Sequence, residues 1–360
     1  MTRVLVVNAG SSSIKTTLLD HDDTVLAHDS LPVEHGGFDA DALAAALDRA
    51  PAPDAVGHRV VHGGSEFTEP VRLDDRVRDR LRDLADLAPL HQAKSLAGID
   101  AVGRALPDVP AVACFDTAFH ATLPPAAATY ALPAAWRDRY ALRRYGFHGL
   151  SHAYASRTAA ELTGRSRTVV AHLGAGASLC AVRDGRSVDT TMGFTPLEGL
   201  VMATRSGSVD PGLLLWLIEH EGLAPADVAD ALEHDSGLTG LAGTGDLRDL
   251  LARDDDASRL AVDVYLHRLR AGIAAMAASL DGLDVLVFTG GVGEHSPQIR
   301  SRATDGLEFL GVALDLDRNA VETVTGAVDV GTSGAPVRTI VVESREDLEV
   351  AAGVRAVLTG

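Results

Sequence analysis

The sequence predicts a duplicated α/β protein, and three observations support this prediction. Short β-type runs alternate with amphipathic helical stretches along the chain. A segment near the N-terminus resembles a second segment in the middle of the chain, which indicates an internal repeat. The 360 residues, 46% of them hydrophobic, are enough to build two domains that each bury a core.

The predicted strands are short and rich in Val, Ile, Leu and Ala, as is typical of strands buried in an α/β sheet. They cover Arg3–Val7, Ile14–Leu19, Ala55–Val60, Ala111–Cys114, Thr168–His172, Leu179–Val182, Val285–Phe288 and Val337–Val342. Helices are expected where apolar residues recur every three or four positions, over Asp74–Leu87, Ala257–Leu280 and Glu346–Leu358. The proline-rich pieces at 51–53 and 124–125 are expected to be loops.

A further helix is expected from its end signals. Asp210 and Pro211 are typical of an N-cap and a first helical residue, and Gly222 is expected to close the helix. The apolar run Leu213–Ile218 inside it is expected to be buried.

The repeat is carried by two segments that align without gaps. Residues 4–20 read VLVVNAGSSSIKTTLLD and residues 168–184 read TVVAHLGAGASLCAVRD. In this alignment Asn8 falls on His172 and Gly10 falls on Gly174. We interpret the pair as one anion-binding hairpin in each half; the alternative is two unrelated glycine-rich turns. A third small-residue turn, VFTGGVGEH at 287–295, follows a predicted strand.

Small residues in these turns indicate phosphate binding. They let backbone N–H groups approach an anion closely. The first turn also carries three serine hydroxyls and is followed by Lys15, a set that suits phosphoryl oxygens and a hydrated Mg²⁺. The P-loop pattern GxxxxGK[ST] is absent, so this is a different kind of phosphate site. A simple tight turn is the alternative for any one of the three.

Charge and composition exclude several classes of protein. The chain has 32 Lys+Arg against 50 Asp+Glu, a net charge of −18, which argues against general binding of nucleic acid or anionic membranes. Cys114 and Cys180 form no pair typical of a disulfide framework or a thiolate metal site. The N-terminus lacks the pattern of a signal peptide, and no apolar run approaches ~20 residues. A cytoplasmic protein without membrane segments is therefore expected.

Four polar residues beside turns are candidates for a functional site. Arg59 ends a strand before two glycines, and Asp116 directly follows a buried strand, where α/β active sites tend to lie. His148 stands between glycines, and Arg205 stands among small residues. Each has a structural alternative, namely a surface ion pair for the arginines, a helix N-cap for the aspartate and a solvated loop position for the histidine.

At these residues the chain resembles the acetate kinases, the acetokinase family, within the superfamily of sugar kinases, actin and heat-shock ATPases. The matching motifs are VNAGSSSIK (7–15), GHRVVHGG (57–64), APLH (88–91), FDTAFH (115–120), RRYGFHGLSH (143–152), HLGAGAS (172–178), TPLEGLVMATRSG (195–207) and FTGGVGE (288–294). The resemblance implies two actin-like (ribonuclease H-like) domains, each with a mixed five-stranded sheet, and an interdomain cleft. The domains would be 1–149, with a C-terminal helix 347–360 packed on it, and 150–346, which would bind the nucleotide.

The resemblance also implies roles for individual residues. The catalytic residues would be Asp116, Arg59, Arg205 and His148. Asn8 and Glu346 would hold Mg²⁺ (or Mn²⁺), and Lys15, Ser11, Ser12 and Ser13 would lie at the phosphates. Arg59, Val61, Leu90, Phe147 and Pro196 would form the substrate pocket. ATP would be bound by His172, Leu173, Gly174, Ala175, Gly176, Asp246, Leu247, Arg248, Gly291, Val292, Gly293, Glu294 and His295.

The implied reaction is the reversible transfer of the ATP γ-phosphoryl group to acetate, giving acetyl phosphate and ADP, by a homodimer. Acetate is already ionised at neutral pH, so the reaction needs no general base. The difficulty is to bring one anion to another, which positioning and neutralisation of charge must solve. Asp116 is therefore expected to orient Arg59 or a metal-bound water rather than to remove a proton.

Several positions on the nucleotide side depart from the family pattern. Ala175 and His295 stand where the family usually has asparagine, and Leu247 stands where an aromatic residue is usual. These departures leave alternatives open: propionate or butyrate as the acceptor, pyrophosphate as the donor, or a non-catalytic nucleotide-binding paralogue.

Overall fold

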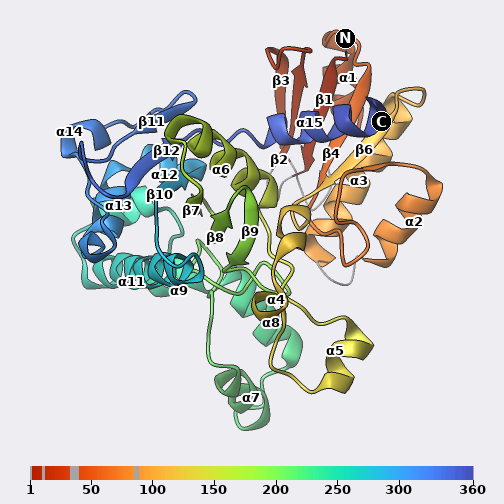
Figure 1. The fold of residues 1–360 in the computed structure, drawn as a ribbon. Coiled ribbons are helices and arrows are strands. Elements are labelled where there is room, and N and C mark those ends of the chain that lie inside the picture. Colours follow the sequence, from red (N-terminus) through yellow and green to blue (C-terminus); the bar gives the residue numbers. More distant parts are fainter. Residues whose placement is uncertain (1, 10–12, 33–39, 85–88, 360) are drawn as a thin grey trace. The chain divides into compact units, whose positions relative to one another are not determined.

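The computed structural model describes residues 2–9, 13–32, 40–84 and 89–359, and these form two compact units (Figure 1). Unit 1 comprises Met1–Ala121, Phe147–Leu150 and Arg345–Gly360, and unit 2 comprises Thr122–Gly146 and Ser151–Ser344. The expected first domain is 1–149 with the helix 347–360 packed on it, whereas here residues 122–146 belong to unit 2. Ser11 and Ser12 lie outside the described residues.

The first third of the chain and its C-terminus supply the elements of unit 1. They are β1 (Val4–Ala9), β2 (Ser13–Leu19), β3 (Val25–Pro32), α1 (Ala40–Arg49), β4 (Ala55–Val60), β5 (Val71–Arg72), α2 (Asp75–Asp83), α3 (Pro89–Ala105), β6 (Ala111–Phe115), η2 (Ala118–Thr122) and α15 (Glu346–Thr359).

The remaining elements form unit 2, apart from the first two residues of α6, which belong to unit 1, and Thr122, the last residue of η2, also belongs to unit 2. They are α4 (Pro125–Ala128), α5 (Ala134–Tyr140), α6 (Gly149–Thr163), β7 (Arg167–Leu173), β8 (Ala177–Arg183), β9 (Arg186–Thr190), α7 (Pro211–Glu219), α8 (Pro225–His234), α9 (Gly237–Ala242), α10 (Leu247–Ala252), α11 (Asp256–Ser279), β10 (Val285–Thr289), α12 (Gly290–His295), α13 (Pro297–Thr304), η3 (Glu308–Leu310), α14 (Leu316–Asn319), β11 (Ala327–Asp329) and β12 (Arg338–Val342).

The two sheets have the same topology, as the sequence repeat predicts. Their orders are β3-β2-β1-β4-β6-β5 and, read in the same sense, β9-β8-β7-β10-β12-β11. In each sheet three central strands are parallel, and the repeated hairpin (β1–β2 or β7–β8) adds antiparallel strands on one side. The expected number of five strands in each sheet is wrong, because each sheet has six. The sixth strands, β5 and β11, span only two and three residues at an edge, too short to give a sequence pattern.

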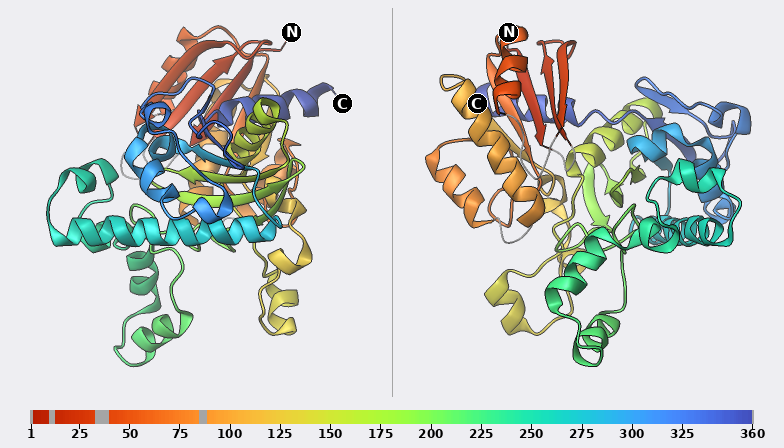
Figure 2. Two further views of the ribbon diagram at one scale, coloured as in Figure 1. Left: turned by 60° about the vertical axis from the view of Figure 1, so that its left-hand side comes forward. Right: turned by 180° about the vertical axis from the view of Figure 1, so that it is seen from behind.

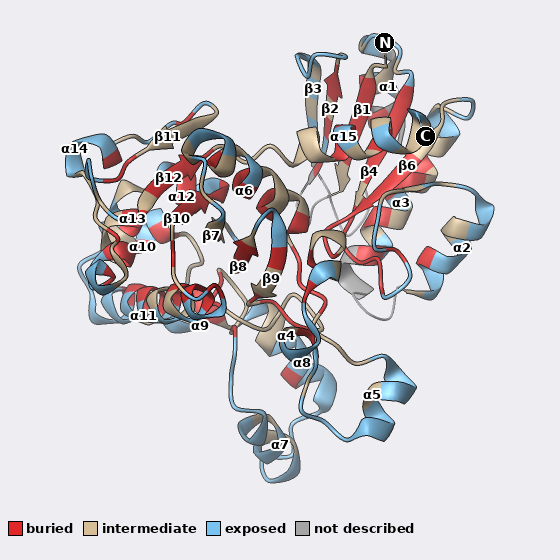
Figure 3. Cartoon of the chain, in the orientation of Figure 1, coloured by how far each residue is buried: buried red, intermediate tan, exposed pale blue. Residues whose placement is uncertain are grey.

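The central strands are apolar without alternation because both faces of the sheet are covered (Figure 3). In β1, Val4 and Val6 pack in one cluster with Val350 of α15, whereas Leu5 and Val7 pack in another with Val102 of α3. The C-terminal helix is therefore part of the core of unit 1. In unit 2 the 24-residue helix α11 packs against β7, β8 and β9 (Figure 2).

All eight predicted strands are confirmed, with bounds within two residues of those expected. The prediction missed β3 and β9 as well as the two short edge strands. β3 is an outer strand whose residues are mostly exposed, so it carries no apolar run. The predicted loop at 51–53 is confirmed, but the one at 124–125 is wrong at Pro125, which begins α4 as a first-turn proline.

Helix α7 begins as predicted, but its apolar face is not buried. The Asp210 side chain accepts a hydrogen bond from Gly212 N, and Pro211 is the first helical residue. Leu213, Leu215 and Trp216 are 47%, 57% and 47% exposed, so the expected burial of Leu213–Ile218 is wrong. The reason is that α7 projects from unit 2 and packs mainly against α8 (Figure 1). In the described part of the chain, no helix is long and apolar enough to cross a bilayer.

Candidate active site

Three neighbouring parallel strands of unit 1 end in the polar residues that the sequence singled out. Asn8 of β1 pairs in register with Arg59 of β4, and Arg59 in turn pairs with Cys114 of β6. Asp116 follows β6 by one residue, and its backbone N–H donates to Val60 O at 3.0 Å. Because the carboxyl ends of parallel strands meet at one edge of a sheet, Asn8, Arg59 and Asp116 are brought together.

Arg59 and Asp116 form a bidentate ion pair. Arg59 Nε donates to Asp116 Oδ1 at 2.9 Å, and Nη2 donates to Oδ2 at 2.5 Å. The side chain of Asp116 is 1% exposed and that of Arg59 is 16% exposed. Burial raises the pKa of Asp116 to about 6, although the charge of Arg59 opposes this rise. The carboxylate is thus ionised at neutral pH and fixed in one orientation against the guanidinium.

Asn8 and Glu346 complete the polar cluster. Arg59 Nη1 donates to Asn8 Oδ1 at 3.0 Å, Asn8 Nδ2 donates to Glu346 Oε2 at 3.4 Å, and Glu346 Oε2 lies 3.5 Å from Arg59 Nε. Burial alone would lower the pKa of Arg59, but the charges of Asp116 and Glu346 raise it above its ordinary value. A guanidinium has five N–H groups, and the bonds to described residues use one on each nitrogen. One N–H on each terminal nitrogen is left for a ligand.

The same cluster fits a hydrated magnesium ion. Mg²⁺ prefers oxygen ligands, keeps several waters and commonly takes one or two protein groups. The amide oxygen of Asn8 and the carboxylate of Glu346 have lone pairs beyond the bonds described above. Among the described residues, no group of three or more His, Cys, Asp or Glu side chains could enclose a metal ion. The donor set therefore suits an ion that is completed by water and substrate oxygens.

The loop that carries His148 reaches the backbone of Asp116. Gly149 N donates to Asp116 O at 2.9 Å, and a Cβ at position 149 would lie 2.1 Å from that oxygen. His148 has a left-handed backbone, with φ 57°, which is uncommon for a side-chain-bearing residue and typical of functional loops. Phe147 is buried and meets the buried ring of His62 edge-to-face, 5.4 Å between centroids. Unit 1 thus brings His148 to the backbone of the ion-paired aspartate.

Other predicted residues of unit 1 have simpler positions. Lys15 is exposed on β2 and lies directly opposite Asn8, so the two side chains share one face of the sheet. Ser13 begins β2, and Val61 is buried after β4. Leu90 belongs to α3.

Unit 2 has a pocket of about 590 Å³, a volume typical of small-molecule sites. Most of the residues predicted to bind the nucleotide line this pocket. The predicted residues that line it are Gly174, Ala175, Asp246, Leu247, Arg248, Gly291, Val292 and His295. Three further lining residues, Leu238, Gly245 and Ser296, were not predicted from the sequence. His172, Leu173, Gly176, Gly293 and Glu294 do not line it. Gly174 and Ala175 belong to the β7–β8 turn, so this turn forms part of the pocket lining.

Several polar groups of unit 2, two of them in this pocket, are held by local bonds. Asp246 caps α10 by accepting from Arg248 N at 2.8 Å, and the Arg248 side chain also donates to it. These bonds lower the pKa of Asp246 to about 2. At the end of β7, His172 Nδ1 lies 2.8 Å from Ser151 Oγ. Arg205 Nη1 donates to Pro196 O at 3.4 Å, and burial lowers the pKa of Arg205 against the opposing charge of Glu233.

A buried arginine that the sequence analysis missed supports one wall of the pocket. Arg300 is 0% exposed and donates to the carbonyl oxygens of Gly293 and Glu294 at 2.9 and 2.8 Å, at the C-terminal end of α12. It also bonds Asn319 Oδ1, Asn319 O and Val321 O. The carboxylate of buried Glu294 accepts from Ser344 N at 3.0 Å, so it fixes the same helix rather than lining the pocket. A single arginine in a helical stretch gives no sequence signal of such a role.

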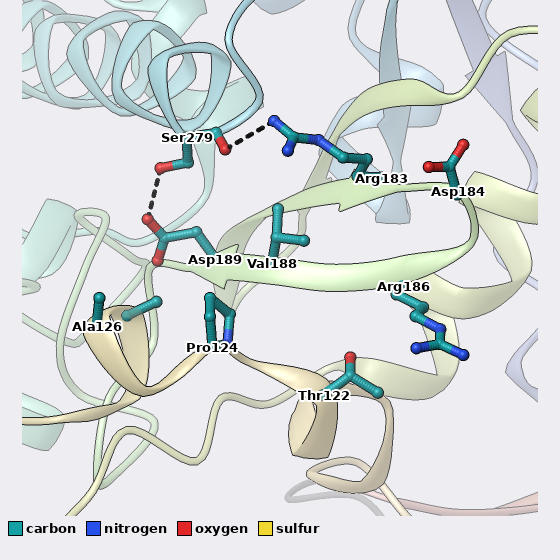
Figure 4. A pocket seen from close by; sticks show the side chains of 10 residues that line it. Thr122, Pro124, Ala126, Arg183, Asp184, Arg186, Val188, Asp189 and Ser279 are labelled. Carbon is teal, nitrogen blue, oxygen red and sulfur yellow. Dashed lines mark hydrogen bonds between the residues drawn. The ribbon is translucent and has the colours of Figure 1, made fainter.

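A second pocket, of about 920 Å³, lies elsewhere in unit 2, beside the β8–β9 hairpin (Figure 4). Arg183 and Arg186 share its lining with Asp184 and Asp189. Ser279 Oγ donates to Asp189 Oδ2 at 2.8 Å. The charged groups of this lining cancel, and none of the predicted site residues belongs to it.

The comparisons with known proteins agree with this arrangement. The sequence profile of the acetokinase family matches residues 40–352. The acetate kinase of Leifsonia xyli subsp. xyli is 47% identical, with 98% of each chain covered. Among solved structures, Porphyromonas gingivalis acetate kinase (34% identity, TM-score 0.90, 99% of this chain and 100% of that one) and Francisella tularensis propionate kinase (32%, 0.90, 99% and 100%) have the same fold. This chain, with its two six-stranded mixed sheets, belongs to the acetokinase family.

Proposed function

We propose that this protein is a phosphotransferase that moves the γ-phosphoryl group of ATP to acetate, reversibly and with Mg²⁺, to give acetyl phosphate and ADP. The observation that carries the proposal is the buried bidentate pair Arg59–Asp116 beside Asn8 and Glu346. The relative at 47% identity bears the name acetate kinase, which supports the same reaction.

The ion pair suits a reaction that needs alignment more than proton transfer. Acetate is ionised at neutral pH, so its carboxylate oxygen can attack the γ-phosphorus without a base. Arg59 donates to both carboxylate oxygens of Asp116, and its positive charge opposes protonation of the aspartate. The two remaining N–H groups of Arg59 would hold the acetate or the transferring phosphoryl group, with a charge that is in place before the substrates arrive.

The other groups of unit 1 would complete the substrate end. Asn8 and Glu346 would hold Mg²⁺, which when bound neutralises phosphate charge. Lys15 would approach the phosphates from the same face of the sheet as Asn8. His148 would stabilise charge on the phosphoryl group during transfer.

In unit 2, Arg205 would neutralise the transferring phosphoryl group, and the pocket at the β7–β8 turn would take the nucleotide. Its glycines and Ala175 leave the backbone open to a ligand, and Leu238, Leu247 and Val292 offer apolar surface. Ala175 supplies no side-chain donor there, so backbone amides and Arg248 would supply the polar contacts.

The acceptor is a short carboxylate held by apolar residues. Val61, Leu90, Phe147 and Pro196 would contact the methyl group. A solved neighbour at 32% identity is named propionate kinase, so propionate is the second candidate acceptor. One methylene changes selectivity by only about 10- to 200-fold in such pockets.

We also propose that the chain forms a homodimer through unit 2. Helix α7 presents the exposed apolar residues Leu213, Leu215 and Trp216, and α5 presents Trp136 and Tyr140, which are 56% and 53% exposed. On α7, Leu213 and Trp216 are three residues apart and so share one face of the helix, and an exposed apolar face of this kind typically marks a protein–protein interface.

The first test is formation of acyl phosphate. Purified protein with ATP, Mg²⁺, acetate and hydroxylamine is expected to give the coloured hydroxamate, with less product from propionate and butyrate.

Arg59→Lys is expected to lower kcat/KM for acetate by roughly 100-fold, since an ammonium cannot make the bidentate pair. The exposed Arg72→Lys is the matched control. If the wild-type protein forms no product from any of the three acceptors, with either ATP or pyrophosphate as donor, the proposed phosphotransferase activity is refuted.

The dimer is tested by sedimentation. Sedimentation equilibrium of the wild-type protein is expected to give a molecular mass twice that of the chain. The Trp216→Ser variant is expected to give a mass closer to that of the monomer. Leu162→Ser, which changes an exposed leucine on α6, is the control and should leave the mass unchanged. A monomeric wild-type chain at micromolar concentration would contradict the proposal.

Removal of the Arg300 charge tests the support of the nucleotide pocket. Arg300→Met leaves five oxygens, four of them in buried hydrogen bonds, without this donor, so the free energy of unfolding is expected to fall by more than about 3 kcal/mol. ATP affinity is expected to fall as well. Arg302→Met on the same helix breaks only a surface pair with Asp263 and is expected to change little. Urea unfolding and calorimetric ATP titration measure both effects, and equal behaviour of the two variants would contradict the role of Arg300.

A further inference from the structure

Tyr130, Arg144 and Glu198 of unit 2 form a hydrogen-bonded cluster. The Tyr130 hydroxyl donates to Glu198 Oε2 at 2.5 Å. Arg144 Nη2 donates to Glu198 Oε1 at 2.7 Å, so both carboxylate oxygens are held. The Arg144 guanidinium also lies over the Tyr130 ring, 5.5 Å from its centroid. The three side chains are thereby locked against one another.

This cluster clamps the backbone of residues 191–198. Arg144 Nη1 donates to the carbonyl oxygens of Thr191 and Met192, each at 3.0 Å. Phe194 N donates to the Tyr130 hydroxyl at 2.9 Å. With Glu198 at its far end, the segment is fixed at its beginning, middle and end.

Gly193 shows how closely the cluster is packed. A Cβ at this position would lie 1.9 Å from Glu198 Oε2 and 2.2 Å from the Tyr130 hydroxyl. The Gly193 carbonyl also accepts from Tyr145 N and Gly146 N, at 3.1 and 3.2 Å. These two residues directly precede Phe147 and His148 in the sequence. The clamp therefore ties down the chain that leads into a second predicted site segment.

The environment keeps the bonds of the cluster strong. The side chain of Arg144 is only 17% exposed. Burial and the bond to Glu198 raise the pKa of Tyr130, so the phenol keeps its proton and remains a donor. Bonds to a charged partner in a partly buried site contribute more than neutral surface bonds.

The clamped segment contains Pro196, whose carbonyl accepts from Arg205 Nη1 at 3.4 Å. We propose that the Tyr130–Arg144–Glu198 cluster positions Pro196 and Arg205 and thereby sets the selectivity for the acyl substrate, an inference that rests on the proposed function. None of the three side chains is expected to contact the substrate. They are positioning residues, and the motifs RRYGFHGLSH and TPLEGLVMATRSG carry two of them without showing what they do.

Tyr130→Phe tests this by removing one hydroxyl and no carbon. The ratio of kcat/KM for acetate to that for propionate is expected to fall roughly three- to tenfold, the range that corresponds to one lost hydrogen bond. The KM for ATP is expected to stay within about twofold, because the cluster does not line the nucleotide pocket. Glu198→Gln, which keeps the size of the side chain and loses the charge, is expected to shift the ratio in the same direction.

Tyr154→Phe, which removes a hydroxyl from α6, is the matched control and should leave the ratio unchanged. If Tyr130→Phe does not fold, Glu198→Gln carries the test. An unchanged ratio in the folded variants, or an equal loss for both acceptors accompanied by a higher KM for ATP, would overturn the inference. A wild-type protein that makes no acyl phosphate would instead refute the proposed function itself.

Discussion

The ion pair between Arg59 and Asp116 is the interaction on which the rest of the site depends. In a chain with a net charge of −18, a cation that must meet anionic substrates needs a fixed place and a fixed orientation. Asp116 provides the orientation by holding two of the three guanidinium nitrogens, and Asn8 holds the third. The aspartate is buried and the arginine is partly open, so the positive end of the pair is the one that a ligand can reach.

The fold explains why these residues meet although they are far apart in the sequence. Parallel strands β1, β4 and β6 end at one edge of their sheet, and α15 closes over one face of that sheet, so Glu346 at its start reaches the same cluster. The second sheet repeats this topology, and its equivalent hairpin turn leads to the pocket of unit 2. Duplication therefore supplied two similar strand-end sites, one of which carries the ion pair and the other an open pocket.

The sequence predicted those features that depend on neighbours along the chain. Apolar runs gave the eight strands, and the repeat of residues 4–20 at 168–184 gave the matching hairpins. Features that depend on distant contacts were not predictable in this way. Whether the apolar face of α7 is covered depends on what packs there, and the bonds of Arg300 join α13 to α12 and to residues 319–321. Arg144 and Glu198 stood in recognised motifs, but only the fold brings them to Tyr130.

We propose that Asp116 acts through Arg59 and does not remove a proton. Steady-state kinetics of the Asp116→Asn variant with acetate and ATP distinguish these two roles. The asparagine keeps the size of the side chain and loses the charge and one of the two acceptor oxygens. We expect kcat to fall by about 100-fold or more while the KM for acetate changes by less than about threefold, because the oriented charge is needed most in the transition state. Comparable losses in kcat and in acetate affinity would contradict it.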